Sequence, residues 1–265
     1  MKKLHFHYEM QLQLAGPAID HYFRFRCLPY KEDVQQDMDT SFYVEPAGFL
    51  REITDGFGSR CLTGEALAPH EGLHVVSRGN VLVDHSKRKM AEADPVFRYP
   101  SHFTEPEENI RQLYENVMGE YVRSGDSGRG IFFVRRLMEA VYRHMSYVPG
   151  ATDIHTTAAQ ALRGGKGVCQ DYTHILLSMC RMAGIPARYA AGAMIGEGAT
   201  HAWAEVWLEG MWLGADPTNC CMTDETYIKF SHGRDYGDCT VDRGCFRGAA
   251  GQQQRIYVKV EETTW

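Results

Sequence analysis

The stretch at residues 164–188 constrains this chain most. It passes from a glycine-rich turn, Gly-Gly-Lys-Gly, directly into an apolar run that ends at Gly184, with Pro186 just beyond. Glycine after a helix and proline soon afterwards are helix stop signals, so the sequence predicts a helix that begins at or beside Cys169 and ends at Gly184. Apolar residues occur almost all round this helix, and we therefore expect it to be central and buried, with only its first turn at a cleft.

The place of Cys169 on the first helical turn favours a reactive thiol. The unpaired N–H groups and the positive end of the helix dipole stabilise a thiolate over a thiol. The same N–H groups can hold an oxyanion. The alternative is a buried structural thiol, which is the usual fate of a free cysteine, and this segment alone leaves both interpretations open.

Composition excludes several classes of protein. A chain of 265 residues with 44% hydrophobic and 23% charged residues is typical of a soluble globular protein with one large or two modest domains. Its net charge is −6 and it has no basic run, so we expect no nucleic-acid partner. No stretch approaches the roughly 18 to 20 apolar residues that span a bilayer, and the first residues lack the apolar segment of a signal peptide. We therefore expect a cytoplasmic protein without membrane contact.

The eight cysteines do not form the disulfide framework of a small secreted domain. A zinc site is an alternative interpretation of the late group Cys220, Cys221, Cys239 and Cys245, which has His232 between its members. The spacing lacks the two-residue separations of structural zinc sites, so we expect free thiols and no metal.

The first third of the chain is predicted to be β structure. Apolar and polar residues alternate from Tyr8 to Leu14, and turn-rich breaks such as Ala15-Gly16-Pro17 separate the expected strands. These strands fall at residues 22–28, 40–44, 49–53, 60–63 and 73–83. We expect an antiparallel β-sandwich-like domain at residues 1–90, followed by a linker at 91–106 that contains several prolines.

Residues 107–265 are predicted to form a second, α+β domain with an antiparallel sheet. Apolar stripes at helical spacing predict helices at 107–121 and 131–147, with a short one at 156–162 before the central helix. After that helix the period changes to two, which predicts strands at 187–195, 201–208, 211–216, 243–247 and 255–261.

One hairpin gives a geometric prediction. Glu209-Gly210 is a natural two-residue turn, so Leu208 pairs with Met211. His201 then lies diagonal to Asp216 on one face of the sheet, with Cβ atoms about 7 Å apart or less. Together with the upstream Cys169, this pair fits an activated thiol, a proton shuttle and a carboxylate that orients the imidazole. The alternative is that His201 is only a satisfied polar residue.

The same register creates a difficulty. Ala202, Ala204, Val206 and Leu208 form the opposite, aliphatic face of this strand and suit packing on the central helix. His201 would then point away from Cys169 unless the start of the helix meets the start of the strand. Residues near this point are expected to line a cleft for substrate, namely Gln170, Asp171, Tyr172 and Trp203, although core packing is equally open for Trp203.

Three blocks of the sequence resemble the signature of the bacterial transglutaminase-like superfamily, within the papain-like cysteine enzymes. They are Gly-Val-Cys-Gln-Asp-Tyr at residues 167–172, His-Ala-Trp-Ala-Glu-Val at 201–206 and Asp-Pro-Thr-Asn at 216–219. The β-rich first third resembles the N-terminal domain often found ahead of that core. Residues 232–236 resemble a segment that is typical downstream.

This resemblance implies a papain-like core in which Cys169 is the nucleophile, His201 the general base and Asp216 the orienting acid. It also implies that the start of the central helix meets the sheet where the His201 strand begins. No metal or organic cofactor is implied, and the expected substrate is a peptide or protein.

The reaction stays open, because members of the family include crosslinkers, peptidases, deglycosylating amidases and inactive relatives. We favour a cysteine protease or amidase that acts through a thioester, since water needs no second-substrate site. The alternatives are a protein-glutamine transglutaminase or peptide ligase that uses an amine, and a non-catalytic binding module. The sequence does not indicate an oligomeric state.

Overall fold

A 24-residue strand, β1 (Lys2–Phe25), organises the largest sheet of the computed structural model, which describes residues 1–248 and 251–264. The first half of β1 pairs with β6 and β16, and its second half pairs with β5 and β15. The register shifts around residues 14–17, where Pro17 lacks the N–H that a regular ladder needs. The sequence predicted a break between two strands here, whereas the structure keeps one strand with an irregularity.

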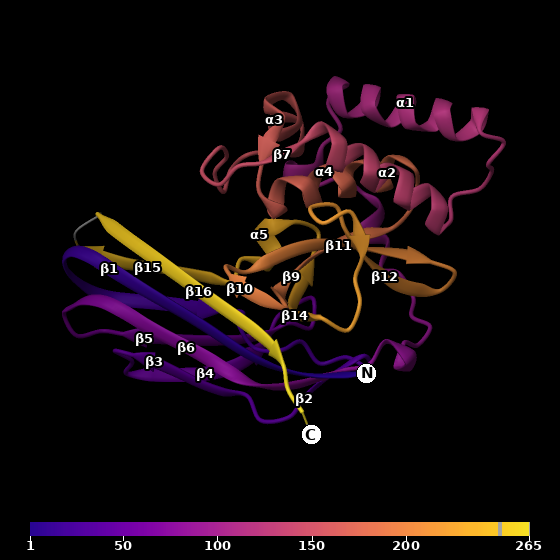
Figure 1. Ribbon diagram of the computed structural model, residues 1–265. Helices are drawn as coiled ribbons and strands as arrows, with labels where there is room; N and C mark the ends of the chain where they lie inside the picture. The colour runs from indigo at the N-terminus through magenta and orange to yellow at the C-terminus, as the bar shows by residue number, and fades with distance from the viewer. Residues whose placement is uncertain (249–250, 265) are drawn as a thin grey trace.

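The strands expected as an N-terminal sandwich form a single hydrogen-bonded sheet that curls around β1 (Figure 1). Across the curl, Phe25 of β1 packs on Phe42 of β3, with ring centroids 6.1 Å apart. The nine strands of this sheet are β1, β2 (Gln35–Asp37), β3 (Ser41–Glu45), β4 (Phe49–Thr54), β5 (Arg60–Ala66), β6 (His70–Val83), β10 (Gly196–Gly198), β15 (Asp242–Gly248) and β16 (Gln252–Glu262).

A second sheet of five strands lies between the large sheet and the helices (Figure 1). All of its neighbours are antiparallel, as predicted. In order across the sheet, its strands are β13 (Cys221–Met222), β12 (Met211–Asp216), β11 (His201–Leu208), β9 (Ala187–Met194) and β14 (Tyr227–Gly233).

Helices cover the face of this five-stranded sheet that is turned away from the large sheet (Figure 1). They are α1 (Glu108–Arg123), α2 (Ile131–His144), α3 (Ala158–Gly164) and α4 (Cys169–Met182). The shorter elements are η1 (His85–Lys87), η2 (Pro95–Arg98), η3 (His102–Thr104), α5 (Tyr236–Cys239) and the parallel pair β7 (Ser146–Tyr147) and β8 (Lys166–Gly167). The prediction of a mixed helix and sheet architecture is confirmed. No helix in the described part of the chain has the length and apolar character needed to cross a membrane.

The end of the chain lies elsewhere than predicted. The strands expected at residues 243–247 and 255–261 were assigned to the second domain, but β15 and β16 pair with β1 in the large sheet. β10, which directly precedes the His201 strand, also pairs with β16. The large sheet is therefore built from both ends of the sequence and makes backbone contact with the segment before His201.

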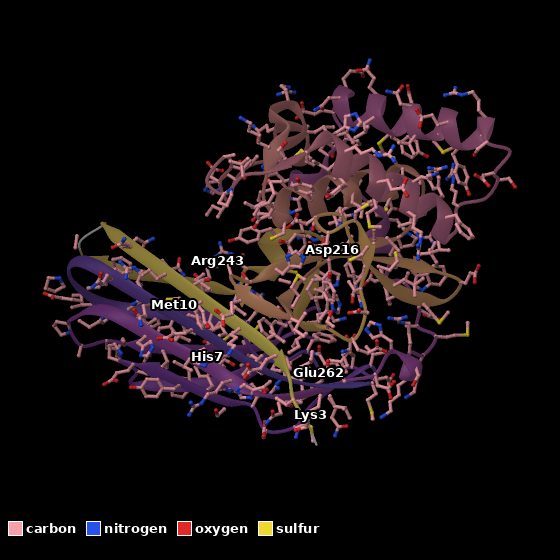
Figure 2. All side chains as sticks on the ribbon, viewed as in Figure 1. Lys3, His7, Met10, Asp216, Arg243 and Glu262 are labelled. Atoms are coloured by element: carbon pink, nitrogen blue, oxygen red, sulfur yellow. The ribbon has the colours of Figure 1, made fainter. Side chains whose placement is uncertain are left out.

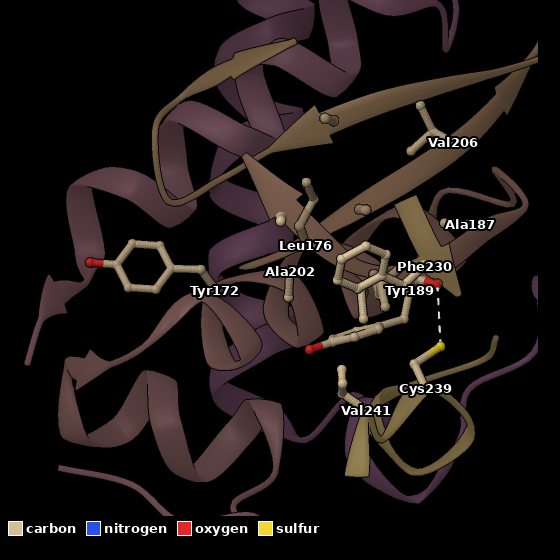
Figure 3. Close-up of a cluster of buried hydrophobic side chains, with 14 of the residues drawn as sticks. Tyr172, Leu176, Ala187, Tyr189, Ala202, Val206, Phe230, Cys239 and Val241 are labelled. Atoms are coloured by element: carbon tan, nitrogen blue, oxygen red, sulfur yellow. Dashed lines mark hydrogen bonds between the residues drawn. The ribbon is translucent and has the colours of Figure 1, made fainter. Parts of the chain in front are cut away.

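The central helix α4 is buried almost all round, as predicted. Ile175 and Leu176 are completely buried and belong to one core cluster with Ala202 and Val206, the aliphatic face of β11 (Figure 3). The chain leaves the helix at Gly184, whose φ of 73° lies in the left-handed region that favours glycine. This packing fixes the position of the first turn of α4 relative to the five-stranded sheet.

Candidate active site

The turn before α4 is held by Asp171, two residues after Cys169. The carboxylate Oδ2 of Asp171 accepts hydrogen bonds from the backbone N–H of Val168 and the hydroxyl of Thr152, both at 2.7 Å. A side chain on Gly167 would meet that same oxygen at 2.5 Å, so only glycine permits this close approach. Asp171 thus fixes the direction in which Cys169 is presented.

This role corrects one expectation. Asp171 is 1% exposed, and burial raises its pKa against the hydrogen bonds from Thr152 and Val168 that lower it. A side chain so enclosed cannot touch a substrate. Asp171 therefore supports the turn from inside and does not line a cleft.

The predicted hairpin register is confirmed. Leu208 pairs with Met211, and the turn residues Glu209 and Gly210 have φ values of 51° and 83°, as a type I′ turn requires. The Nε2 atom of His201 lies 2.7 Å from Oδ2 of Asp216. Sequence spacing alone therefore located this diagonal pair.

Asp216 is completely buried, and its two oxygens are saturated with hydrogen bonds. Oδ1 accepts from the backbone N–H groups of Thr218 at 2.9 Å and Asn219 at 3.2 Å. Oδ2 accepts from His201, from Nδ2 of Asn219 at 2.7 Å and from the hydroxyl of Tyr227 at 2.9 Å. Burial alone would raise the pKa of Asp216, but the bond to His201 and the other donors hold it below its usual value. The carboxylate is therefore ionised and fixed in direction.

His201 lies between Asp216 and Cys169. Because Nε2 is used for Asp216, Nδ1 is the ring nitrogen left for an interaction with Cys169. Burial lowers the pKa of His201, but the hydrogen bonds and charges of Asp216 and Cys169 outweigh it and raise the pKa to about 10. The imidazole is thus held as an imidazolium beside a partly exposed sulfur.

The register of β11 predicted that His201 would point away from Cys169. The position of His201 at the start of the strand resolves this difficulty. Ala202, Ala204 and Val206 pack toward α4 as expected. His201 is the first residue of β11, and there the N-terminus of α4 reaches the sheet, so its imidazole lies near Cys169 although it belongs to the opposite face. The three predicted chemical groups therefore come together.

The other expected cleft residues behave differently from one another. Gln170 is half-buried on the same helical turn as Cys169. Tyr172 is 3% exposed and belongs to the hydrophobic core, which overturns its expected contact with substrate (Figure 3). Trp203 is equally buried, with its ring packed edge-on against Tyr227 at 5.4 Å and stacked 6.3 Å from His201. Core packing, the alternative noted for Trp203, is the arrangement observed.

Sequence reasoning missed two supports of Asp216. Asn219 lies in the Asp-Pro-Thr-Asn block, where a turn that folds back on its own aspartate is a readable signal. Tyr227 comes from β14, which was not predicted, and nothing in the local sequence connects this tyrosine with residue 216. Only the pairing of β14 with β9 brings it there.

Three of the late cysteines have different surroundings. Cys239 is buried 3.7 Å from the carbonyl oxygen of Tyr189, Cys221 lies 3.6 Å from the hydroxyl of Tyr227, and Cys245 is exposed on β15. Within residues 1–248 and 251–264, no group of three or more His, Cys, Asp or Glu side chains is placed to share a metal ion.

Comparison with known proteins agrees with this geometry. The family model described as "Transglutaminase-like superfamily" matches residues 105–217, which contain all three groups. An uncharacterized protein of Mycobacterium leprae is 36% identical over 126 residues, which make up 44% of this chain and 45% of the relative. An uncharacterized protein of Mycobacterium tuberculosis is 37% identical over 127 residues, or 42% of this chain and 40% of the relative. The chain thus matches less than half the length of these relatives.

Among solved structures, a candidate cysteine protease of Cytophaga hutchinsonii has a similar fold over the whole chain. The TM-score is 0.79 with 21% sequence identity, and the match covers 100% of this chain and 91% of the other. The likeness includes the large sheet as well as the helical layer, since no part of the chain falls outside it.

Proposed function

We propose that this chain is a cysteine-dependent acyl-transfer enzyme that acts on peptide or protein amides, since residues 105–217 match the model of the transglutaminase-like superfamily. Cys169 is the proposed nucleophile, His201 the proton carrier and Asp216 the group that orients it. The observation that carries the proposal is the position of His201, which is hydrogen-bonded to a buried carboxylate and whose pKa is also raised by the nearby, partly exposed Cys169 thiol.

The first half of the proposed reaction forms a thioester. The thiolate of Cys169, paired with the His201 imidazolium, attacks the amide carbonyl carbon, and the carbonyl oxygen takes the negative charge. Backbone N–H groups in the first turn of α4 have no partner within the helix and are suited to stabilise that oxyanion. As the C–N bond breaks, the imidazolium donates its proton to the leaving amine.

The second half regenerates the enzyme. His201, now neutral, removes a proton from an incoming water, whose oxygen attacks the thioester carbonyl. The C–S bond breaks, the carboxylic acid leaves and the proton on His201 restores the ion pair. Asp216 keeps Nε2 protonated and the ring in one orientation throughout. An amine that takes the place of water would give transamidation, and we favour hydrolysis because water needs no second binding site.

Thiol reactivity tests the proposal without knowledge of the substrate. The alkylation rate of each cysteine by iodoacetamide is measured at pH 6 by peptide mass spectrometry. We expect Cys169 to react at least tenfold faster than the exposed Cys245, because a thiolate is the attacking species, and His201→Ala to abolish the difference. Equal rates for the two cysteines in the wild-type protein would contradict the proposal.

The acceptor is identified in a second experiment. Wild-type protein and Cys169→Ala are incubated with a peptide library in the presence and absence of hydroxylamine, and the products are identified by mass spectrometry. Hydrolysis predicts free acids without hydroxylamine and hydroxamates with it, and no product from the variant. Amine-dependent crosslinks without free acids would favour transamidation, and reactive Cys169 with no turnover of any peptide would favour the binding-module alternative.

A further inference from the structure

A cavity of about 530 Å³ lies between the inner face of the large sheet and the catalytic layer, at a site that the proposed reaction does not use. Its walls are mainly apolar and include Leu12, Phe23 and Leu73 from the sheet and Phe103 and Ile154 from the other side. Figure 2 labels two more of its lining residues, Met10 on β1 and Arg243 on β15. Cavities of this size with mainly apolar walls and a few polar groups are typical of small-molecule sites.

One buried polar side chain in this cavity is unexplained by the fold. His21 is 3% exposed, and its Nδ1 atom has no hydrogen-bond partner among the described residues. Its ring is held by stacking on His70, with centroids 5.2 Å apart, and by Phe246 at 5.3 Å. No hydrogen-bond partner is found for Nε2 either among the described residues, but Nε2 is not fully buried like Nδ1, so it is the ring nitrogen that a ligand can reach.

The ring presents a hydrogen-bond donor to the cavity. Burial, with a smaller effect of His70, lowers the pKa of His21 to about 4, so it is neutral near pH 7 and carries one proton. A proton on the sealed Nδ1 would be an orphaned N–H, which folded proteins avoid more strongly than an orphaned acceptor. The proton therefore belongs on Nε2. The missing side chain of Gly244 leaves space there, since a Cβ would lie 2.8 Å from Nε2.

The charges of the cavity indicate an uncharged ligand. Asp242 and Arg243 line it with opposite charges, and Gln254 donates a hydrogen bond to Asp242 at 2.6 Å. A charged ligand would be attracted electrostatically by one of these two side chains and repelled by the other. An aromatic or aliphatic body instead matches the phenylalanine and leucine walls.

We propose that this cavity binds an uncharged, mainly apolar small molecule whose carbonyl or hydroxyl oxygen accepts a hydrogen bond from Nε2 of His21. The site is distinct from the Cys169 centre, but its walls are fixed to α4. Phe103 stacks on His174 of that helix at 5.1 Å, and the backbone N–H of Tyr236 donates to Nε2 of His174 at 3.1 Å. One wall of the cavity is thus held in place by contacts to α4.

The test uses two fluorinated probes of the same shape. 4-Fluoroacetophenone carries a carbonyl oxygen, whereas 4-fluoro-α-methylstyrene has a CH2 group in its place, and binding of each is measured by ¹⁹F NMR titration. We expect dissociation constants on the order of 1 mM for a fragment of this size, with the ketone bound about fivefold more tightly. No saturable binding of either probe would overturn the proposal.

Two variants locate the binding. His21→Phe keeps a ring of similar shape, so both probes should still bind but with equal affinity, which also shows that the variant is folded. Ile154→Asp, at the cavity wall, should weaken both probes at least fivefold, whereas Val122→Asp on the exposed face of α1 should change neither. A preference for the ketone that survives in His21→Phe would exclude the proposed hydrogen bond. Because Cys169→Ala should bind both probes like the wild type, the result does not depend on catalysis.

Discussion

The candidate site depends on the hydrogen bonds that the carboxylate of Asp216 accepts. The oxygen of Asp216 that faces His201 also accepts from Asn219 and Tyr227, so three donors share one negative charge. The raised pKa of His201 has a consequence for folding. The interactions that raise this pKa stabilise the folded state. Their stabilisation is fully present below pH 6.5 and is lost as the pH rises through about 10.

Tyr227→Phe tests the saturation of Asp216. Removal of one donor leaves the carboxylate a stronger acceptor for the imidazolium, so the pKa of His201 should rise above its wild-type value near 10. The loss of a buried hydrogen bond to a charged group should also cost about 1.5–3 kcal/mol of stability.

The titration is followed by NMR at the ring carbon protons of His201, with Tyr257→Phe, an exposed tyrosine of β16, as the control. An unchanged or lower midpoint in Tyr227→Phe would show that its hydroxyl does not influence the pair.

Among the secondary-structure elements, the β11–β12 hairpin has the His201–Asp216 pair at one end and a buried charge network behind it. Glu205 lies between Nε of Arg188 at 2.6 Å and Nζ of Lys229 at 2.9 Å, and Lys229 also reaches Glu32, in the segment before β2, at 2.6 Å. Arg188 in turn covers the ring of Trp212 at 4.1 Å. These contacts link four strands of the five-stranded sheet, β9, β11, β12 and β14, and join them to the segment before β2.

Glu205→Gln should therefore lower the free energy of unfolding by about 3 kcal/mol, because it leaves two buried cations without their shared counter-charge. The matched control is Glu197→Gln, whose exposed carboxylate lies 3.8 Å from Lys259 and should contribute less than about 1 kcal/mol. Urea denaturation of both variants measures the difference. Equal losses would mean that the buried network contributes no more than a surface ion pair.

The elements also show why sequence reasoning succeeded and failed. The register of β11 and β12 was predictable because a two-residue turn fixes it locally. The partners of β15 and β16 were not, because period-two alternation identifies a strand but not its neighbour. Asp171 and Tyr172 were misassigned for a related reason, since the first turn of a helix has an inner side as well as a cleft side.

At the scale of the whole molecule, the two layers are expected to unfold together. Val260 of β16 is 2% exposed and pairs with both Phe6 and Gly196, so it joins β1 to the segment before His201. Trp203, Trp207 and Trp212 all lie in the five-stranded sheet, so tryptophan fluorescence reports mainly on that sheet.

Val260→Asp should shift the denaturant midpoint seen by tryptophan fluorescence and by far-UV circular dichroism equally. Burial of an unpaired carboxylate should cost about 3 kcal/mol or more. Lys259→Asp, on the exposed side of the same strand, is the control. A fluorescence midpoint that stays at the wild-type value while the circular dichroism midpoint falls would mean that the layers unfold independently.

The pairing of β10 with β16 also bears on how the protein matures. During synthesis the thiol and the imidazole leave the ribosome dozens of residues before the strand that braces their neighbouring segment. In a nascent chain the segment before His201 therefore lacks its strand partner until β16 docks, so the arrangement proposed for thiol chemistry is completed late in folding.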